Sequence, residues 1–262
     1  MDKATEKNLA RALGAENTEL LPYLPYLLQD LRNLGTPIKP VLDMIKTHIP
    51  DISDCKVLDL GAGKGNVGLP IAKETGASVF LVDAISEFTE YSQKKAVEMG
   101  ITNCTFQTED ITVTVRTVRD YDLVLLCSVG NIFDDCNSLS TLRVLKQTVR
   151  PGGHIVIEES YFKDEKFEVK CAADYETLND WLQSFEKAGV KLIAQYDEGD
   201  SEEGIDFESD NGHIRQRVDE LIEKYPDKKE LFESYVRSQL NECDDLGRLH
   251  TSIWLLQVLG EK

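Results

Sequence analysis

The sequence has few basic residues for its number of acids. Its 262 residues include 29 lysines and arginines against 47 aspartates and glutamates, so the formal net charge is −18. No run of basic residues offsets this charge, and the phosphate backbone of a nucleic acid would be repelled by such a surface. We therefore expect no nucleic acid as substrate or partner.

Cysteine pairs and long apolar runs are also missing. The six cysteines are scattered, and none forms the C-x-x-C pair that is typical of a zinc site. The N-terminal stretch is charged throughout, and no apolar run approaches the length of a membrane span. These absences predict a cytoplasmic protein with reduced thiols, no metal site and no membrane association.

A glycine-rich turn stands out in the first half of the chain. The apolar run of residues 57–60 leads into three alternating glycines within residues 61–65, and a further apolar stretch follows. This pattern is typical of a buried strand that turns sharply into a helix, with a bare backbone that a nucleotide-like ligand can approach closely. Residues 63–68 also fit the G-x-G-x-x-G pattern of dinucleotide sites, so the turn alone leaves both ligand classes open.

From residue 56 onward, short β runs alternate with helical segments. A strand–helix unit every 20 to 30 residues or so predicts parallel strands with right-handed crossovers, and hence a doubly wound α/β sheet. Strands are expected at residues 56–60, 78–83, about 103–107, 121–127 and 153–158, and helices at about 66–75, 87–98, 113–118 and 138–149.

Helical segments flank this core. Leucines recur at helical spacing near the N-terminus, and the prolines and glycine predict one helix from about Pro25 to Gly35 and a second that ends at Pro50. After the fifth strand we expect a helix, a sixth strand, a solvated loop with eight acids at 197–210, two amphipathic helices and a last strand at 251–259. The expected division is an N-terminal helical lid (1–36), a core (37–196), a helical cap insert (197–248) and a final core strand (249–262).

Acidic residues end or follow the first three predicted strands. Ligands of open α/β sheets bind at the carboxyl ends of the parallel strands, so these acids matter most. Asp59 ends the first strand, where a carboxylate can hold an ammonium group, and Asp83 ends the second, where a carboxylate accepts ribose hydroxyls. Asp110 and Ile111 follow the third strand and offer an acceptor for an exocyclic amine beside an apolar face for a purine.

These features, with the Arg150-Pro151-Gly152-Gly153 turn before strand five, resemble the class I S-adenosylmethionine-dependent methyltransferases over about residues 40–160. The resemblance implies a seven-stranded, mostly parallel, Rossmann-like sheet with an antiparallel last strand and a helical cap. It also implies that S-adenosylmethionine is bound by Asp59, Gly61 and Gly63 at its methionine end, by Asp83 at the ribose, by Asp110 and Ile111 at the adenine, and by the backbone around Cys127 and Ser128.

Three further residues are candidates for catalysis. Methyl transfer from a sulfonium depends mainly on alignment and on exclusion of water, and a base is needed where the acceptor arrives protonated. Glu158 and Glu159 stand at the expected end of strand five, where either could bind a cationic acceptor or take its proton. The resemblance places the start of the final strand at the same edge, which adds His250. This chemistry demands no metal.

The acceptor is expected to be a small molecule. Residues 128–131 lack the Asn/Asp-Pro-Pro-aromatic motif with which related enzymes methylate the exocyclic amines of bases, in agreement with the acidic charge. Three alternatives stay open: a methyltransferase of protein side chains, a non-catalytic module that binds S-adenosylmethionine, and an NAD-dependent oxidoreductase on the same fold. The oligomeric state also stays open.

Overall fold

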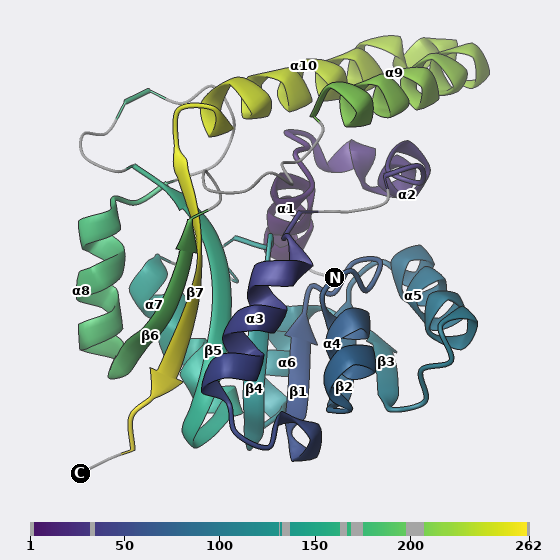
Figure 1. The fold of residues 1–262 in the computed structure, drawn as a ribbon. Helices are drawn as coiled ribbons and strands as arrows, with labels where there is room; N and C mark the ends of the chain where they lie inside the picture. The colour runs from purple at the N-terminus through teal and green to yellow at the C-terminus, as the bar shows by residue number, and fades with distance from the viewer. Residues whose placement is uncertain are drawn as a thin grey trace.

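A seven-stranded sheet forms the centre of the structure (Figure 1). The computed structural model describes residues 3–31, 35–130, 132, 137–162, 167–168, 175–197 and 207–260, and the structural statements below concern these residues. The strand order is β3-β2-β1-β4-β5-β7-β6, and β7 runs antiparallel to both of its neighbours, whereas the other pairings are parallel. The strands are β1 (Lys56–Leu60), β2 (Ser78–Asp83), β3 (Cys104–Thr108), β4 (Tyr121–Leu126), β5 (Val149–Tyr161), β6 (Val190–Asp197) and β7 (His250–Val258).

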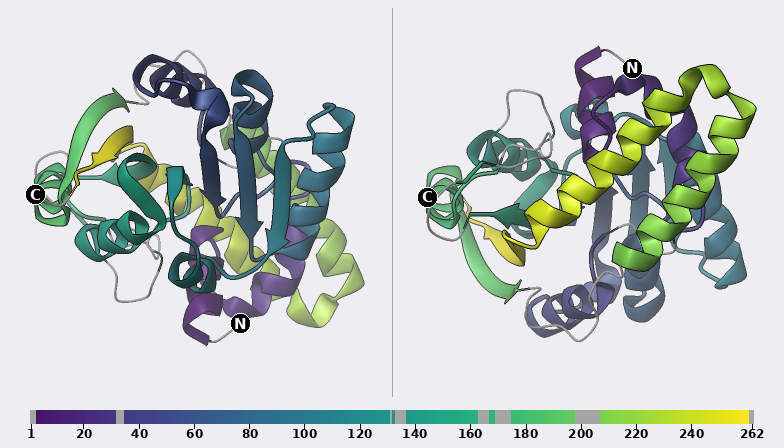
Figure 2. Two further views of the ribbon diagram at one scale, coloured as in Figure 1. Left: turned by 90° about the horizontal axis from the view of Figure 1, so that it is seen from below. Right: turned by 90° about the horizontal axis from the view of Figure 1, so that it is seen from above.

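Helices cover both faces of this sheet (Figure 1, Figure 2). Successive strand residues point to opposite faces, so Val57 packs in the core on one side and Leu58 in the core on the other. Because both faces are buried, the central strands are apolar along almost their whole length. One face carries α3 (Ile38–His48), α4 (Gly68–Thr75) and α5 (Ser86–Glu98), and the other α6 (Ile111–Thr117), α7 (Ser138–Thr148) and α8 (Leu178–Ala188).

A helical cap lies above the carboxyl ends of the parallel strands (Figure 1, Figure 2). It combines two segments that are far apart in the sequence, because neither segment alone buries its apolar face. Its N-terminal part consists of α1 (Lys3–Ala12), the 3-10 helix Thr18–Tyr23 and α2 (Leu24–Leu27), and its C-terminal part of α9 (Phe207–Lys224) and α10 (Lys229–Leu246).

The cap has a core of its own that also reaches the sheet. Phe232 and Tyr235 of α10 are fully buried in it, and the Tyr235 hydroxyl donates a hydrogen bond to the carbonyl of Leu13 at 3.0 Å. Arg217 of α9 forms a two-pronged ion pair with Asp30, at 2.5 and 3.1 Å. Phe88 and Ile85, at the start of α5, belong to the same core and so join the cap to the sheet.

The fold predicted from the sequence is confirmed, including the antiparallel last strand. One predicted helix is wrong, because α2 ends at Leu27 instead of continuing to Gly35. After α2, the chain turns three carbonyl groups towards the ammonium of Lys64, which a continuing helix would not allow. A regular helix also precedes the prolines, at Lys3–Ala12. Most of the acidic loop at 197–210 lies outside the described residues.

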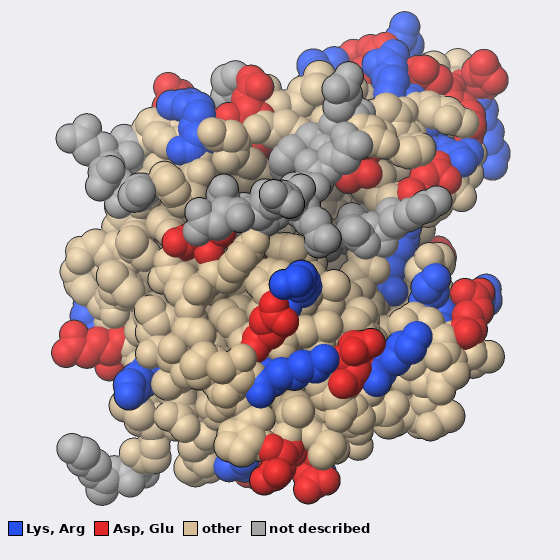
Figure 3. All heavy atoms as spheres, viewed as in Figure 1, with Lys and Arg blue, Asp and Glu red and all other residues tan. Residues whose placement is uncertain are grey.

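The described surface carries charges of both signs. On the face shown in Figure 3, lysines and arginines are interspersed with aspartates and glutamates. Among the described residues, no helix combines the length and apolar character that crossing a membrane requires. In the same part of the chain, His, Cys, Asp and Glu side chains form no group of three or more that could hold a metal ion.

Candidate functional site

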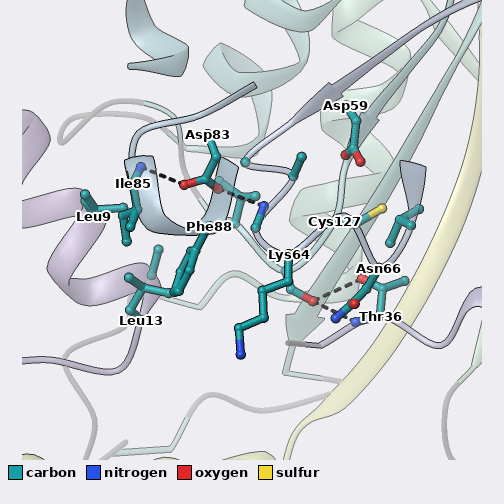
Figure 4. Close-up of a pocket in the computed structure, with 17 residues that line it drawn as sticks. Leu9, Leu13, Thr36, Asp59, Lys64, Asn66, Asp83, Ile85, Phe88 and Cys127 are labelled. Atoms are coloured by element: carbon teal, nitrogen blue, oxygen red, sulfur yellow. Dashed lines mark hydrogen bonds between the residues drawn. The ribbon is translucent and has the colours of Figure 1, made fainter. Parts of the chain in front are cut away.

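A cavity of about 80 Å³ lies where the carboxyl ends of β1, β2 and β4 meet the cap (Figure 4). Six of the residues expected to bind the cofactor line it: Asp59, Gly61, Gly63, Asp83, Cys127 and Ser128. Leu9 of α1 and Leu13, which follows this helix, lie at one side of the site, and Asp59, Cys127 and Thr36 at the other. The cavity is therefore formed jointly by the sheet and the cap.

The turn after β1 can be built only with glycines at certain positions. Gly61 has φ +70°, and a Cβ atom there would lie 2.5 Å from Cγ2 of Val129. A Cβ atom on Gly68, at the start of α4, would lie 2.6 Å from Oδ2 of Asp59. Glycine thus brings the backbone close to the Asp59 carboxylate and keeps the turn open to the cavity.

Asp59 is buried at the end of β1, with 2% of its surface exposed. Its Oδ2 accepts a hydrogen bond from the Gly68 backbone N–H at 3.0 Å. Burial raises the pKa of Asp59 to about 7; the Gly68 hydrogen bond opposes part of this shift and the charge of Asp83 adds to it. A cationic ligand group beside Asp59 would favour the ionised form, so the site suits an ammonium group.

Asp83 connects the glycine turn to the start of α5. Its Oδ2 accepts a hydrogen bond from the Gly63 backbone N–H, and its Oδ1 accepts one from the Ile85 backbone N–H, both at 2.8 Å (Figure 4). Burial raises the pKa of Asp83, while these two hydrogen bonds favour its charged form. The carboxylate thereby fixes the shape of the turn while it lines the cavity.

Asp110 and Ile111 lie outside the cavity lining. Asp110 is the N-cap of α6, and its Oδ1 accepts a hydrogen bond from the Thr112 backbone N–H at 2.8 Å. The preceding residue, Glu109, donates its backbone N–H to the Asp83 carbonyl at 2.9 Å. Asp110 and Ile111 therefore lie close to the end of β2. In this structure the Asp110 side chain caps α6.

Ser128 and Glu158 meet in a buried hydrogen-bond network with Thr36. The Ser128 hydroxyl donates to Oε2 of Glu158 at 2.6 Å, and the Thr36 hydroxyl donates to the same oxygen. The Thr36 backbone N–H donates to the Ser128 hydroxyl at 3.1 Å. Beside them, burial raises the pKa of Cys127 well above its usual range, so this cysteine is a neutral thiol. Among the candidate catalytic residues, Glu158 is the one joined directly to the cavity lining.

Glu159 and His250 lie apart from this network. Neighbouring residues of a strand point to opposite faces, so Glu159 lies on the face that carries α7 and α8. Burial raises the pKa of Glu159 to about 8, and the charges of Glu158 and Glu176 add to the shift. His250 begins β7 with an exposed side chain whose ring lies 6.2 Å from that of Tyr161.

Comparison with known proteins identifies the family. The profile of the family described as "Methyltransferase domain" matches residues 51–202, which is more than half of the chain and includes the glycine turn and β1 to β5. The chain belongs to the methyltransferase domain family. The resemblance to class I methyltransferases that the sequence suggested is thereby confirmed.

Relatives and solved structures agree with this assignment. An uncharacterized protein of Mycobacterium tuberculosis strain H37Rv is 30% identical over 119 residues, which cover 45% of this chain and 41% of the relative. The ubiquinone biosynthesis O-methyltransferase of Rickettsia typhi is 26% identical over 124 residues, 46% of this chain and 47% of the relative. The chain thus spans less than half the length of either relative. The S-adenosylmethionine-dependent methyltransferase of Geobacter sulfurreducens, solved in complex with S-adenosylhomocysteine, has the same fold, with a TM-score of 0.69 at 20% identity over 90% of this chain and 97% of that one.

Several residues that line the cavity of this methyltransferase domain were not predicted from the sequence. Lys64 and Asn66 stand within the G-x-G-x-x-G pattern, which could have drawn attention to them. Leu9 and Leu13 are spaced four residues apart, as expected for one face of a helix, but that spacing does not show which surface they cover. Thr36 carries no sequence signal, because its role depends on contacts with residues about 90 and 120 positions away.

Proposed function

We propose that this protein transfers a methyl group from S-adenosylmethionine to a small-molecule acceptor. The observation that carries the proposal is the convergence of Asp59, Asp83 and the glycine turn on one cavity beneath the cap. We further propose that residues 1–36 and 197–248 serve as the cap of a core made by residues 37–196 and 249–262.

The cavity residues fit the proposed cofactor. The side-chain nitrogen of Asn66 is buried and has no hydrogen-bond partner among the described residues, so it is ready to donate to a ligand. Asp59 would hold the ammonium group of the methionine end, and Asp83 the ribose hydroxyls. Asp110 and Ile111 remain the proposed contacts of the adenine. S-adenosylmethionine supplies a methyl group on a sulfonium centre with a good leaving group.

The acceptor side is proposed to involve Glu158. Its carboxylate receives two hydroxyl hydrogen bonds and lies next to Ser128, which lines the cavity. A carboxylate there can take a proton from an acceptor that arrives as an acid. Glu159 and His250 are proposed to act further along the same edge of the sheet. The contribution of α1 to the cavity lining favours a small acceptor over a polypeptide, and the Rickettsia typhi relative is named for ubiquinone biosynthesis.

The proposal is tested by methyl transfer from S-adenosylmethionine labelled in its methyl group. We expect label in small molecules from a panel of phenols, amines, carboxylic acids and thiols, and inhibition by S-adenosylhomocysteine. At 100 times its Kd, S-adenosylhomocysteine should raise the free energy of unfolding by about 2.7 kcal/mol, and NAD should have no such effect. Label in the protein fraction would indicate a protein methyltransferase, and binding without transfer would indicate a non-catalytic module.

Glu158→Gln should separate catalysis from cofactor binding. Glutamine keeps an oxygen that can accept the hydrogen bonds from Thr36 and Ser128, but it cannot take a proton. With an acceptor that must lose a proton, we expect kcat to fall about 100-fold while the affinity for S-adenosylhomocysteine changes less than about twofold. Glu74→Gln is the matched control, because Glu74 pairs with Lys46 on the surface of the protein. Undiminished kcat in Glu158→Gln would exclude this residue as the base.

A further inference from the structure

Lys64 is a buried lysine whose ammonium group donates hydrogen bonds to the cap. It stands between Gly63 and Gly65 in the glycine turn, and only 4% of its surface is exposed. Figure 4 shows its side chain extending away from Asp59 and Asp83. A lysine in such a turn is well placed to bind an anionic ligand group, but here the ammonium points elsewhere.

Three backbone carbonyl groups of the cap receive the Lys64 ammonium. The Nζ atom donates to the carbonyl oxygens of Leu28 at 2.7 Å, Gln29 at 3.0 Å and Leu31 at 2.8 Å, and it lies 5.4 Å from the centre of the Tyr91 ring. All three partners are acceptors, so together they match the three donors of an ammonium group. We call this set of hydrogen bonds the Lys64 clamp.

The clamp acts on a segment whose apolar side chains pack in the cap core. Leu28 and Leu31 pack in the cap core with Phe88, and the segment follows the end of α2, where carbonyl groups lack helical partners and favour a cation. The Leu28 carbonyl also accepts the Leu31 backbone N–H at 3.2 Å, whereas those of Gln29 and Leu31 would need water if the cap moved away from Lys64.

The size of the cavity shows why the position of the cap matters. The cavity measures about 80 Å³, whereas sites for cofactors and other small molecules generally measure about 300–1,000 Å³. Leu9, Ala12 and Leu13 of the cap line it. A nucleoside-sized ligand therefore needs more space than this cavity offers, and the cap forms one of its walls.

We propose that Lys64 is a positioning residue that fastens the cap to the glycine turn, so that the cap must release the Lys64 clamp before cofactor enters or leaves. The identity of the cofactor rests on the proposed function, but the clamp itself does not. Lys64 contributes no atom to the reaction. It keeps α1 over the cavity and thereby excludes water from it.

Lys64→Met tests the clamp in the free protein. Methionine has nearly the same length and is apolar, so it removes the Lys64 donor from all three carbonyl groups and leaves those of Gln29 and Leu31 without a donor among the described residues. In hydrogen exchange, we expect the amides of residues 20–31 to exchange about tenfold faster or more, while those of β1 and β4 are unchanged. The matched control is Lys95→Met, because Lys95 pairs with Glu98 on the surface of α5. Exchange within about twofold of the parent, or faster exchange throughout the sheet, would overturn the proposal.

Binding kinetics give a second readout that distinguishes the clamp from other roles. If the cap must release Lys64, both kon and koff for S-adenosylhomocysteine should rise about tenfold in Lys64→Met, with a smaller change in Kd. A direct contact with the ligand would raise koff alone, and a distorted turn would lower kon; either result would overturn the proposal. Absence of binding by the parent would contradict the proposed function, and hydrogen exchange would still decide the clamp.

A measurement on the parent protein covers the case in which Lys64→Met does not fold. In mass-spectrometric amine labelling, Lys64 should react at least about tenfold more slowly than Lys95, because its ammonium is buried and fully hydrogen-bonded. Equal labelling of the two lysines would show that the clamp does not persist in solution, and would overturn the proposal.

Discussion

Asp83→Ala should weaken the binding of S-adenosylhomocysteine about 100-fold, equivalent to about 3 kcal/mol. The substitution removes the proposed acceptor of the ribose hydroxyls. It also leaves the backbone N–H groups of Gly63 and Ile85 without the carboxylate that now accepts from them. The glycine turn then loses one of its connections to α5 and keeps the one from Ser92 to the Gly63 carbonyl, so the loss of affinity should exceed that of one ligand contact. Titration calorimetry with S-adenosylhomocysteine measures the effect.

Asp122→Ala is the matched control for Asp83→Ala. Asp122 also accepts a backbone N–H, from Lys56 at 2.7 Å, and it pairs with Arg150. It stands near the start of β4, whereas Asp83 stands at the end of β2, so the two carboxylates lie at opposite ends of the parallel strands. We expect Asp122→Ala to lower the melting temperature without changing the affinity. Parental affinity in Asp83→Ala would contradict the proposed site.

The affinity for S-adenosylhomocysteine should fall by about eightfold between pH 7.5 and pH 6, because Asp59 becomes protonated. Its pKa of about 7 in the free protein means that most of the carboxyl groups are ionised at pH 7.5 and about one in eleven at pH 6. An ammonium group binds the ionised form of Asp59, so binding at pH 6 should be accompanied by release of the Asp59 proton. Calorimetry in buffers of different ionisation enthalpy measures that proton release.

Asp59→Asn should remove this pH dependence and weaken binding at pH 7.5. The amide oxygen can still accept the hydrogen bond from Gly68, so the turn is kept. The free variant should be more stable than the parent at pH 8. The raised pKa means that the folded parent binds more protons than the unfolded chain between about pH 4 and pH 7, and its stability therefore falls as pH rises through that range. A pH dependence that persists in Asp59→Asn would assign the titration to another group.

The sheet could be predicted closely because its signals are local. The first two strands, Lys56–Leu60 and Ser78–Asp83, have the predicted bounds, since short apolar runs there are flanked by turn residues. The same local pattern placed Asp59 and Asp83 at strand ends, and parallel strands bring such ends together. The glycine turn added the point of closest approach to the backbone.

The cap and the acceptor side could not be predicted in this way, because they depend on contacts between distant segments. α2 ends at Leu27 and not near Gly35, and the carbonyl groups that follow it bind Lys64, more than 30 residues later. The separation of Glu158 from Glu159 follows from the alternation of a strand, but the hydrogen bonds of Glu158 to the cavity-lining residues Thr36 and Ser128 join distant parts of the chain. From the sequence alone, Asp110 could either cap a helix or contact a ligand. The structure shows the helix cap.

The construction of the cap from both ends of the sequence has a consequence for biosynthesis. The apolar side chains between Ala10 and Leu31 pack against Ile85 and Phe88 and against helical partners that begin at Ile214, about 180 residues further on. At 5–20 residues per second, the N-terminal segment of the nascent chain waits about 10 to 40 s for these helical partners. The core of the cap can therefore close only after α9 and α10 have been synthesised.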